Sequence, residues 1–183
     1  KMMDTYSMSG NVPMVVPLID LRAQYLSLKG EIDEAVARVM EKGNYVMGEE
    51  VEAFEEEWAQ YCGARYCVGV ASGTDALYLA LSSLGSNREV ATTPFTFFAT
   101  TQAIIWSGNH PLFLDIGRNG NLPDMDFGQN FALPVHLYGL PGEWKGDYVV
   151  EDMAQAHGVK PTCRLACFSF YPTKNLGAAG QAG

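Results

Sequence analysis

Positive charge and paired cysteines are both scarce in this chain of 183 residues. The 12 Lys and Arg residues are outnumbered by 21 Asp and Glu residues, which gives a formal net charge of -9. Such an acidic chain is a poor candidate for non-specific binding to nucleic-acid phosphates, so we expect no nucleic-acid partner. The four cysteines have neither a CxxC pair nor the Cys/His spacing typical of zinc sites: Cys62, Cys67, Cys163 and Cys167. We expect reduced core thiols, a cytoplasmic location and no metal.

Long apolar runs are also missing. None approaches the length that crosses a bilayer, so no membrane partner is predicted, and no apolar signal sequence is recognisable. Residues 1–16 begin without methionine and mix Met, Ser, Gly and Pro, which indicates a flexible leader. Residues 17–183 are expected to form one domain, because 48% of the chain is hydrophobic and 18% is charged.

The pattern of the first part of the domain is helical. Residues 31–42 and a second segment from about Glu49 to Gly63 each carry apolar side chains at helical spacing. In the second segment the apolar stripe consists of Val51, Phe54 and Trp58. We expect this stripe to be exposed in a lone copy, and therefore expect a homodimer whose interface lies near the mouth of the site.

From residue 66 onwards, short apolar runs alternate with helical runs. The expected strands are residues 66–71, 89–93, 111–116, 131–138, 148–151 and 165–170, and the expected helices are residues 76–84 and 97–106. This alternation predicts an α/β domain with a mainly parallel sheet flanked by helices. Residues 117–130 and 139–147 show no helical pattern, although parallel crossovers usually contain a helix. Either these strands pair unconventionally or pieces of chain are missing between them.

The turn Ser72-Gly73-Thr74-Asp75 stands between a predicted strand and a predicted helix. Free backbone amides and the positive end of the helix dipole make such a place an anion site, and Gly73 allows a close approach. The alternative is an ordinary N-cap, in which Ser72 or Thr74 satisfies the first amides of the helix. The string alone does not separate the two interpretations.

An acid and a lysine give the sequence its most specific chemistry. Asp152 closes one predicted strand, at the carboxyl edge where open α/β sheets bind ligands, and Lys174 follows another strand after a short turn. This is the pair that a pyridoxal-phosphate enzyme needs: the lysine forms a Schiff base with the aldehyde, and the aspartate keeps the ring nitrogen protonated.

Two further side chains could join that pair. Ser169 could donate to a phosphate, or could simply bond a neighbouring carbonyl as a buried hydroxyl. Phe97 could stack on a flat ring, or could pack its helix onto the sheet. The histidines at 110, 136 and 157 have no metal-ligand spacing and are interpreted as structural or supporting residues.

Six ordered strings resemble one family: "GNYVMGEEVEAFEEEWAQYCGA", "VASGTDALYLAL", "TTPFTFFATTQAI", "LPVHLYG", "VVEDMAQAHG" and "CFSFYPTKNLGA". They are similar to successive landmarks of the DegT/DnrJ/EryC1/StrS aminotransferases, which are sugar-nucleotide transaminases of the fold-type I pyridoxal-phosphate class. The resemblance runs from about Pro17 to Gly180. It implies that the chain is the large domain of such an enzyme, acting on a nucleotide-linked keto sugar with glutamate as the expected amino donor.

The resemblance also implies a role for each matching residue. Lys174 is expected to form the Schiff base and carry the proton, with Asp152 on the pyridine nitrogen and Gln155 on the ring hydroxyl. Phe97 takes the place of the stacking aromatic. The phosphate is expected to be held by the amides and hydroxyls of Gly73, Thr74, Asp75 and Ser169.

The chain also departs from the family. Members continue into a smaller C-terminal domain, which is absent here, and they usually have Gly-Asp-Gly-Gly where this chain has Gly180-Gln181-Ala182-Gly183. Two alternatives therefore accompany the transaminase hypothesis. One is a sugar dehydratase, which the lysine at 174 disfavours because such relatives have histidine there. The other is a shortened, catalytically silent relative that serves as a binding or scaffold module.

Overall fold

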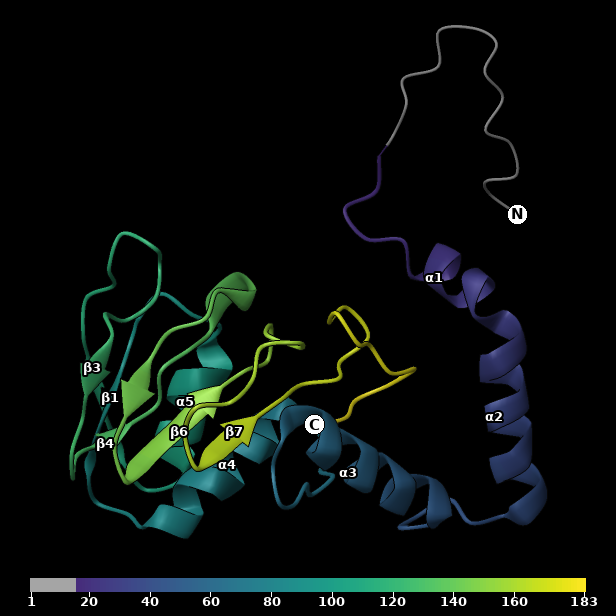
Figure 1. Ribbon diagram of the computed structural model, residues 1–183, viewed down its shortest axis with the longest axis horizontal. Coiled ribbons are helices and arrows are strands. Elements are labelled where there is room, and N and C mark those ends of the chain that lie inside the picture. Colours follow the sequence, from purple (N-terminus) through teal and green to yellow (C-terminus); the bar gives the residue numbers. More distant parts are fainter. Residues whose placement is uncertain (1–15) are drawn as a thin grey trace, which may run out of the picture.

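A computed structural model describes residues 16–183, so the predicted leader, residues 1–16, lies outside the described residues except for Val16. At the centre is a five-stranded sheet in the order β2-β1-β4-β6-β7, in which every neighbouring pair is parallel. Its strands are β1 (Glu89–Thr92), β2 (His110–Phe113), β4 (Phe131–Ala132), β6 (Tyr148–Asp152) and β7 (Leu165–Cys167) (Figure 1). The predicted α/β class with a mainly parallel sheet is confirmed.

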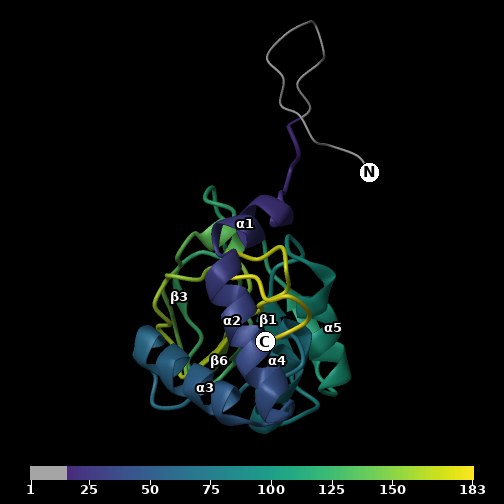
Figure 2. The same ribbon diagram turned by 90° about the vertical axis from the view of Figure 1, so that its right-hand side faces the viewer.

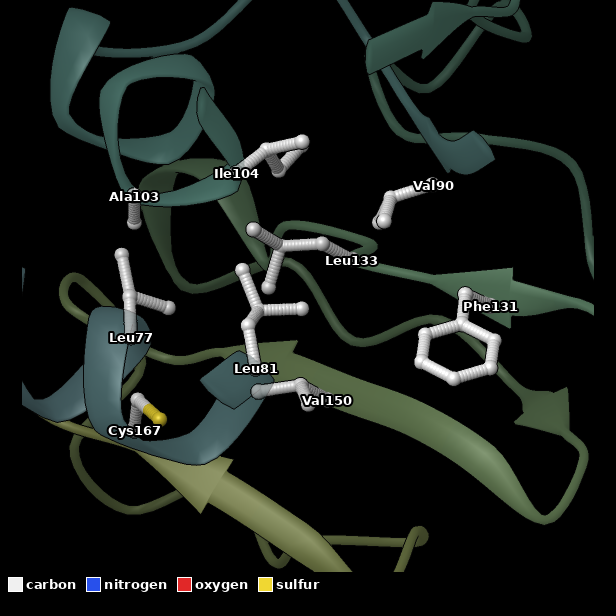
Figure 3. Close-up of a cluster of buried hydrophobic side chains, with 9 residues drawn as sticks. All are labelled: Leu77, Leu81, Val90, Ala103, Ile104, Phe131, Leu133, Val150 and Cys167. Atoms are coloured by element: carbon white, nitrogen blue, oxygen red, sulfur yellow. The ribbon is translucent and has the colours of Figure 1, made fainter. Parts of the chain in front are cut away.

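Two helices cover one face of this sheet: α4 (Gly73–Leu84) and α5 (Phe98–Trp106). Side chains alternate across a strand with a period of two, so Val90 and Val150 face the helices while their neighbours face the other side. Figure 3 shows the resulting core, in which Leu77 and Leu81 of α4 and Ile104 of α5 point towards the sheet. Burial of these aliphatic side chains fixes the position of both helices, and with them the start of each helix at the sheet edge.

The opposite face is covered without a helix. The short strands β3 (Met125–Asp126) and β5 (Trp144–Lys145) pair in parallel as a second, two-stranded sheet. Trp144 is fully buried there against Ala132 and Val149 of the main sheet. The prediction that residues 117–130 and 139–147 contain no α-helix is confirmed. The strands that these residues connect nevertheless pair in ordinary parallel register, and the short strands β3 and β5 stand where a crossover helix is usual.

Helix α3 (Glu49–Cys62) packs beyond β7. The Trp58 ring lies with its centroid 5.0 Å from that of Phe168 and 5.1 Å from that of Phe170, both edge to face. Phe54 also meets Phe170 edge to face, at 5.1 Å. The expectation that the α3 stripe is exposed for a partner subunit is therefore wrong for Phe54 and Trp58, because the residues after β7 fold back and cover both rings.

Helices α1 (Leu21–Ser27) and α2 (Lys29–Lys42) form an N-terminal arm that runs away from the sheet (Figures 1 and 2). The arm ends at Gly43, whose φ of 69° gives the left-handed C-cap that glycine adopts at little cost. No side chain of either helix is buried, and several large apolar side chains of the arm are exposed. No helix within residues 16–183 has both the length and the apolar character that crossing a membrane demands.

Several predicted boundaries differ from the structure. Residues 66–71 form no strand, because only Val70 finds a backbone partner, exchanging two hydrogen bonds with Gly183. The strand predicted over residues 131–138 ends at Ala132; Pro134 has no N–H to continue the ladder, and Leu137–Gly139 is a 3-10 turn. The strands predicted over 111–116 and 165–170 are present but shorter. Helix α4 starts three residues earlier than predicted, so the Ser72–Asp75 segment is the start of the helix and not a separate turn.

Candidate active site

A cavity of about 580 Å³ opens at the carboxyl edge of the main sheet. The segments that line it follow β1, β4, β6 and β7, or begin α4 and α5, because parallel strands deliver all their carboxyl ends to one side. Seven of the eight predicted site residues lie on its wall: Gly73, Thr74, Phe97, Asp152, Gln155, Ser169 and Lys174. The eighth, Asp75, does not line the cavity.

The start of α4 forms one end of the cavity. Ser72 is the N-cap: its Oγ accepts a hydrogen bond from the Asp75 amide at 3.1 Å, and its hydroxyl donates to Asp75 Oδ2 at 2.7 Å. The Asp75 amide is therefore engaged within the chain, in contrast to the role predicted for it. The amides of Gly73 and Thr74 belong to the first turn, where a helix has no acceptor of its own for its N–H groups. They are the donors that an anion at this end would meet.

Gly73 and Ser169 are in close contact at one end of the cavity. A Cβ atom placed on Gly73 would lie 2.6 Å from Ser169 Cβ and 3.2 Å from its Oγ, so no side chain fits between them. The Ser169 Oγ accepts from the Tyr171 amide at 3.4 Å, which leaves the hydroxyl hydrogen free to donate. The helix amides and the Ser169 hydroxyl thus converge on one spot.

Lys174 lies in a short loop that follows β7. The loop is closed at its base by the Ala178 amide, which donates to the Phe170 carbonyl at 2.8 Å, and internally by the Lys174 amide, which donates to the Tyr171 carbonyl at 2.8 Å. Its side chain reaches the cavity wall and is half-buried. Within residues 16–183 no carboxylate forms a salt bridge with its ammonium group, so the amine is available to a ligand.

Asp152, the last residue of β6, is buried at the back of the cavity. Its Oδ1 accepts from the Ala154 amide at 3.1 Å and its Oδ2 from the Thr100 hydroxyl at 2.9 Å. Burial nevertheless raises the pKa of this carboxyl, because the two hydrogen bonds and the charge of Lys174 do not compensate for lost hydration. A buried carboxylate with no cation in contact is a costly group, and it is the kind of group found where a ligand brings the opposite charge.

Gln155 has its side-chain amide oriented by the backbone. The Tyr138 amide donates to Gln155 Oε1 at 2.8 Å, and Tyr138 itself holds a left-handed conformation, with φ of 57°, to do so. Since Oε1 is occupied, the Nε2 group is the end of the side chain that can donate to a ligand. Phe97, at the N-cap of α5, is 63% exposed and borders the cavity, so its ring is free to cover a flat ligand instead of packing in the core.

Sequence reasoning missed two threonines, Thr100 of α5 and Thr96, which precedes the N-cap Phe97. Thr100 is fully buried and bonds Asp152, and its Oγ1 is 2.9 Å from that of Thr96. Both line the cavity. The spacing of four residues, which brings a hydroxyl just before a helix close to one in its first turn, is the signal that could have identified them.

The histidines have structural surroundings. His136 is buried, and because its Nδ1 accepts from the Gly142 amide, Nε2 carries the hydrogen and donates to Glu151 at 3.1 Å. Burial alone would raise the pKa of Glu151, but hydrogen bonds from His136, Cys163 and Thr162 outweigh it and hold that pKa below its usual value. His157 lies among Trp58, Phe168 and Phe170, where burial lowers its pKa. Across residues 16–183 no three His, Cys, Asp or Glu side chains gather as metal ligands would.

Comparison with known proteins places this geometry in a family. Residues 26–183 match the family model described as the DegT/DnrJ/EryC1/StrS aminotransferase family. The chain is 36% identical to a UDP-N-acetyl-3-dehydro-α-D-glucosamine 3-aminotransferase of Acidithiobacillus ferrooxidans, over 92% of this chain and 52% of that protein. It is 39% identical to a dTDP-3-amino-3,4,6-trideoxy-α-D-glucose transaminase of Streptomyces venezuelae, over 92% of this chain and 51% of that protein.

Solved structures agree with this assignment. DesV of S. venezuelae superposes with a TM-score of 0.80 and 36% identity, over 92% of this chain and 52% of that one. NtdA of Bacillus subtilis, with bound PMP, superposes with a TM-score of 0.79 and 28% identity, over 94% of this chain and 45% of that one. The chain therefore spans about half the length of the curated relatives it matches.

Proposed function

Because the chain belongs to the DegT/DnrJ/EryC1/StrS aminotransferase family, we propose that the protein is a pyridoxal-phosphate-dependent aminotransferase. Its substrate is a nucleotide-linked keto sugar and its amino donor is an amino acid, with glutamate as the first choice. The names of the relatives support a nucleotide-linked sugar, since one is named for a UDP-linked 3-dehydro sugar and the other for a dTDP-linked 3-amino sugar. The observation that carries the proposal is that Lys174 and the buried Asp152 line one cavity together with five other residues expected to hold the cofactor.

The cavity fits pyridoxal 5′-phosphate in the chemistry of its donors. One end offers the first amides of α4 and the Ser169 hydroxyl to a phosphate dianion, and Gly73 permits the close contact that such a cradle needs. The other end offers a buried carboxylate, with a lysine amine beside the cavity. When bound, the cofactor supplies an electrophilic aldehyde and a ring that withdraws electrons.

Asp152 binds and holds a proton at the ring nitrogen. Its own pKa is raised by burial, and a cationic nitrogen in contact with it would restore the charged carboxylate and form a charge-assisted hydrogen bond. Each partner then keeps the other ionised: the carboxylate holds the nitrogen protonated and the nitrogen holds the carboxylate deprotonated. An amide at this position could not do the same.

The remaining residues orient the ring and move the proton. Gln155 donates from Nε2 to the ring hydroxyl, since its Oε1 is held by the Tyr138 amide. Phe97 covers one face of the ring and excludes water from it. Lys174 would be the residue that holds the cofactor aldehyde as a Schiff base, with loss of water, and its Nζ atom, once released by the amino donor, would carry the proton of the transfer.

We also propose the wider setting of this site. Residues 17–183 constitute the large, cofactor-binding domain, and the protein acts in the cytoplasm as a homodimer. The exposed apolar side chains of the N-terminal arm, such as Leu21, Leu26 and Met40, support the dimer as a surface that a second copy can cover. Phe54 and Trp58 of α3 do not contribute, because they pack in the core.

Cofactor addition to the purified protein tests the proposal. Pyridoxal phosphate should produce a new absorbance band near the visible edge, and borohydride reduction followed by peptide mass mapping should place the label on Lys174. Lys174→Ala should lose both signals, whereas Lys160→Ala, at an exposed lysine away from the cavity, should keep them. Glutamate added to the loaded protein should yield 2-oxoglutarate.

Two results would count against the proposal. A protein that shows no band, or a band that survives in Lys174→Ala, would remove the cofactor assignment. A labelled Lys174 without amino transfer to any nucleotide-linked keto sugar would favour the catalytically silent relative.

A further inference from the structure

Three oxygen atoms form a chain from the cavity mouth to its buried carboxylate. Thr96 Oγ1 lies 2.9 Å from Thr100 Oγ1, which lies 2.9 Å from Asp152 Oδ2. Thr96 is half-buried, whereas Thr100 has no exposed surface and Asp152 is buried. The chain therefore connects a half-buried hydroxyl to a buried carboxylate.

The ionised carboxylate fixes the direction of every hydrogen bond in this chain. Asp152 as a carboxylate can only accept, so the single hydroxyl hydrogen of Thr100 must point to Oδ2. The Thr100 oxygen is then left as an acceptor, so Thr96 donates to it. With the Ala154 amide on Oδ1, each carboxylate oxygen has one protein donor, and the plane of the carboxylate is fixed.

The Thr100 hydroxyl has a different hydrogen-bond acceptor from that of most threonines in helices. A threonine within a helix commonly returns its hydroxyl to a carbonyl of the preceding turn. Thr100 instead bonds a side chain 52 residues later in the sequence, that of the last residue of β6. Because the threonine is on α5 and the aspartate ends β6, the packing of helix on sheet sets the length of this bond.

We propose that Thr100 is a positioning residue, whose hydroxyl fixes the orientation and the negative charge of Asp152 and so determines how strongly the protein prefers a ligand with a protonated ring nitrogen. Thr96 supports it as the outer hydroxyl of the chain. This inference rests on the proposed function, because it concerns the partner that Asp152 receives from the cofactor.

The other groups that face Asp152 cannot replace this hydrogen bond. Lys174 after β7 acts on Asp152 through its charge, without a hydrogen bond to its carboxylate oxygens, and His136 after β4 makes no hydrogen bond to them either. Cys167, its register partner on β7, is a buried thiol whose pKa is raised by burial and by the aspartate, so it remains neutral. Burial itself raises the pKa of Asp152 and disfavours the charge. The Thr100 and Ala154 donors are what oppose that tendency.

The experiment compares two probes, pyridoxal phosphate and its 1-deaza analogue. The analogue keeps the aldehyde, hydroxyl and phosphate but has a carbon in place of the ring nitrogen. The ratio of their dissociation constants, measured by quenching of tryptophan fluorescence, isolates the contribution of the nitrogen. It is measured for the unmodified protein and for Thr100→Val, Thr100→Ser, Thr96→Val and Thr101→Val.

We expect Thr100→Val, which keeps the shape and removes the hydroxyl, to reduce the preference for pyridoxal phosphate about tenfold, the size expected for a hydrogen bond to a charged group. The affinity for the deaza analogue should stay the same. Thr100→Ser should restore the preference, and Thr96→Val should reduce it about threefold, as an outer member of the chain. Thr101→Val, on the same helix but off the cavity wall, should leave it unchanged.

The possible outcomes separate the inference from the proposed function. If the unmodified protein binds neither probe, the proposed function fails. If it binds pyridoxal phosphate and the ratio is the same in Thr100→Val, the inference is overturned while the cofactor assignment stands. A purely structural role would weaken both probes equally and would also overturn it. If Thr100→Val does not fold, an unchanged ratio in Thr96→Val overturns the inference in its place.

Discussion

Replacing Gly73 with alanine should separate the first turn of α4 from Ser169. The added methyl group would lie 2.6 Å from Ser169 Cβ, well inside the ordinary contact distance of about 3.5–4.0 Å between carbon atoms. It would also lie 3.2 Å from Ser169 Cα, which belongs to the backbone and cannot rotate away. The helix and the strand end must therefore move apart by about 1 Å, and the phosphate donors on either side of the contact move with them.

The magnitude follows from that displacement. Overpacking of this kind costs about 1–3 kcal/mol of unfolding free energy. Loss of one hydrogen bond to a charged phosphate costs about 1.5–3 kcal/mol of binding free energy, which is a weakening of about 10- to 150-fold. Urea unfolding of the apoprotein measures the first quantity and titration with pyridoxal phosphate measures the second.

A double-mutant cycle tests whether the contact with Ser169 is the cause. Ser169→Gly removes the Cβ atom that the methyl group meets, so Gly73→Ala should cost clearly less stability in that background than in the unmodified protein. Gly30→Ala, at a helical position where an added Cβ has nothing within 4 Å, serves as the control. Unchanged stability and unchanged cofactor affinity in Gly73→Ala would show that the close packing of these two segments does not form the cradle.

Two further predictions concern stability. Asp152→Asn should make the apoprotein more stable at pH 7 by about 0.5–2 kcal/mol. Burial raises the pKa of Asp152 in the folded state. The contribution of Asp152 to stability is therefore largest below the unfolded pKa of about 3.9 and is lost as the pH rises through the folded pKa. The advantage should disappear below about pH 4, and an apoprotein that loses stability at pH 7 on this substitution would contradict the account. Trp58→Ala should lower the free energy of unfolding in urea by about 3–5 kcal/mol, because Trp58 is only 9% exposed and packs on Phe168 and Phe170. Trp106, which is 58% exposed, should tolerate alanine and serves as the control. Similar losses of stability at both positions would contradict this prediction.

Local sequence was sufficient where a short segment carries its own signal. Apolar spacing with a glycine at the end predicted the helix that ends at Gly43, and the order of apolar runs predicted the parallel sheet. The strand predicted over residues 66–71 was not found, because a strand also needs a neighbour at hydrogen-bonding distance and Val70 alone has one. The sequence also did not show that Trp58 of α3 would be covered, because the rings of Phe168 and Phe170 that pack on it lie more than 100 positions later in the chain.

At the cavity, the sequence by itself determined which groups are available: a lysine after a strand, an acid at the end of another, and small residues at a helix start. Only the tertiary structure decided how they are used. The burial that raises the pKa of Asp152, the Thr100 hydroxyl that opposes it and the Tyr138 amide that orients Gln155 all come from other elements. The charge state and the orientation of a side chain depend on its distances to other groups and on its hydration. Distance and hydration are set by the tertiary structure and not by neighbouring positions along the chain.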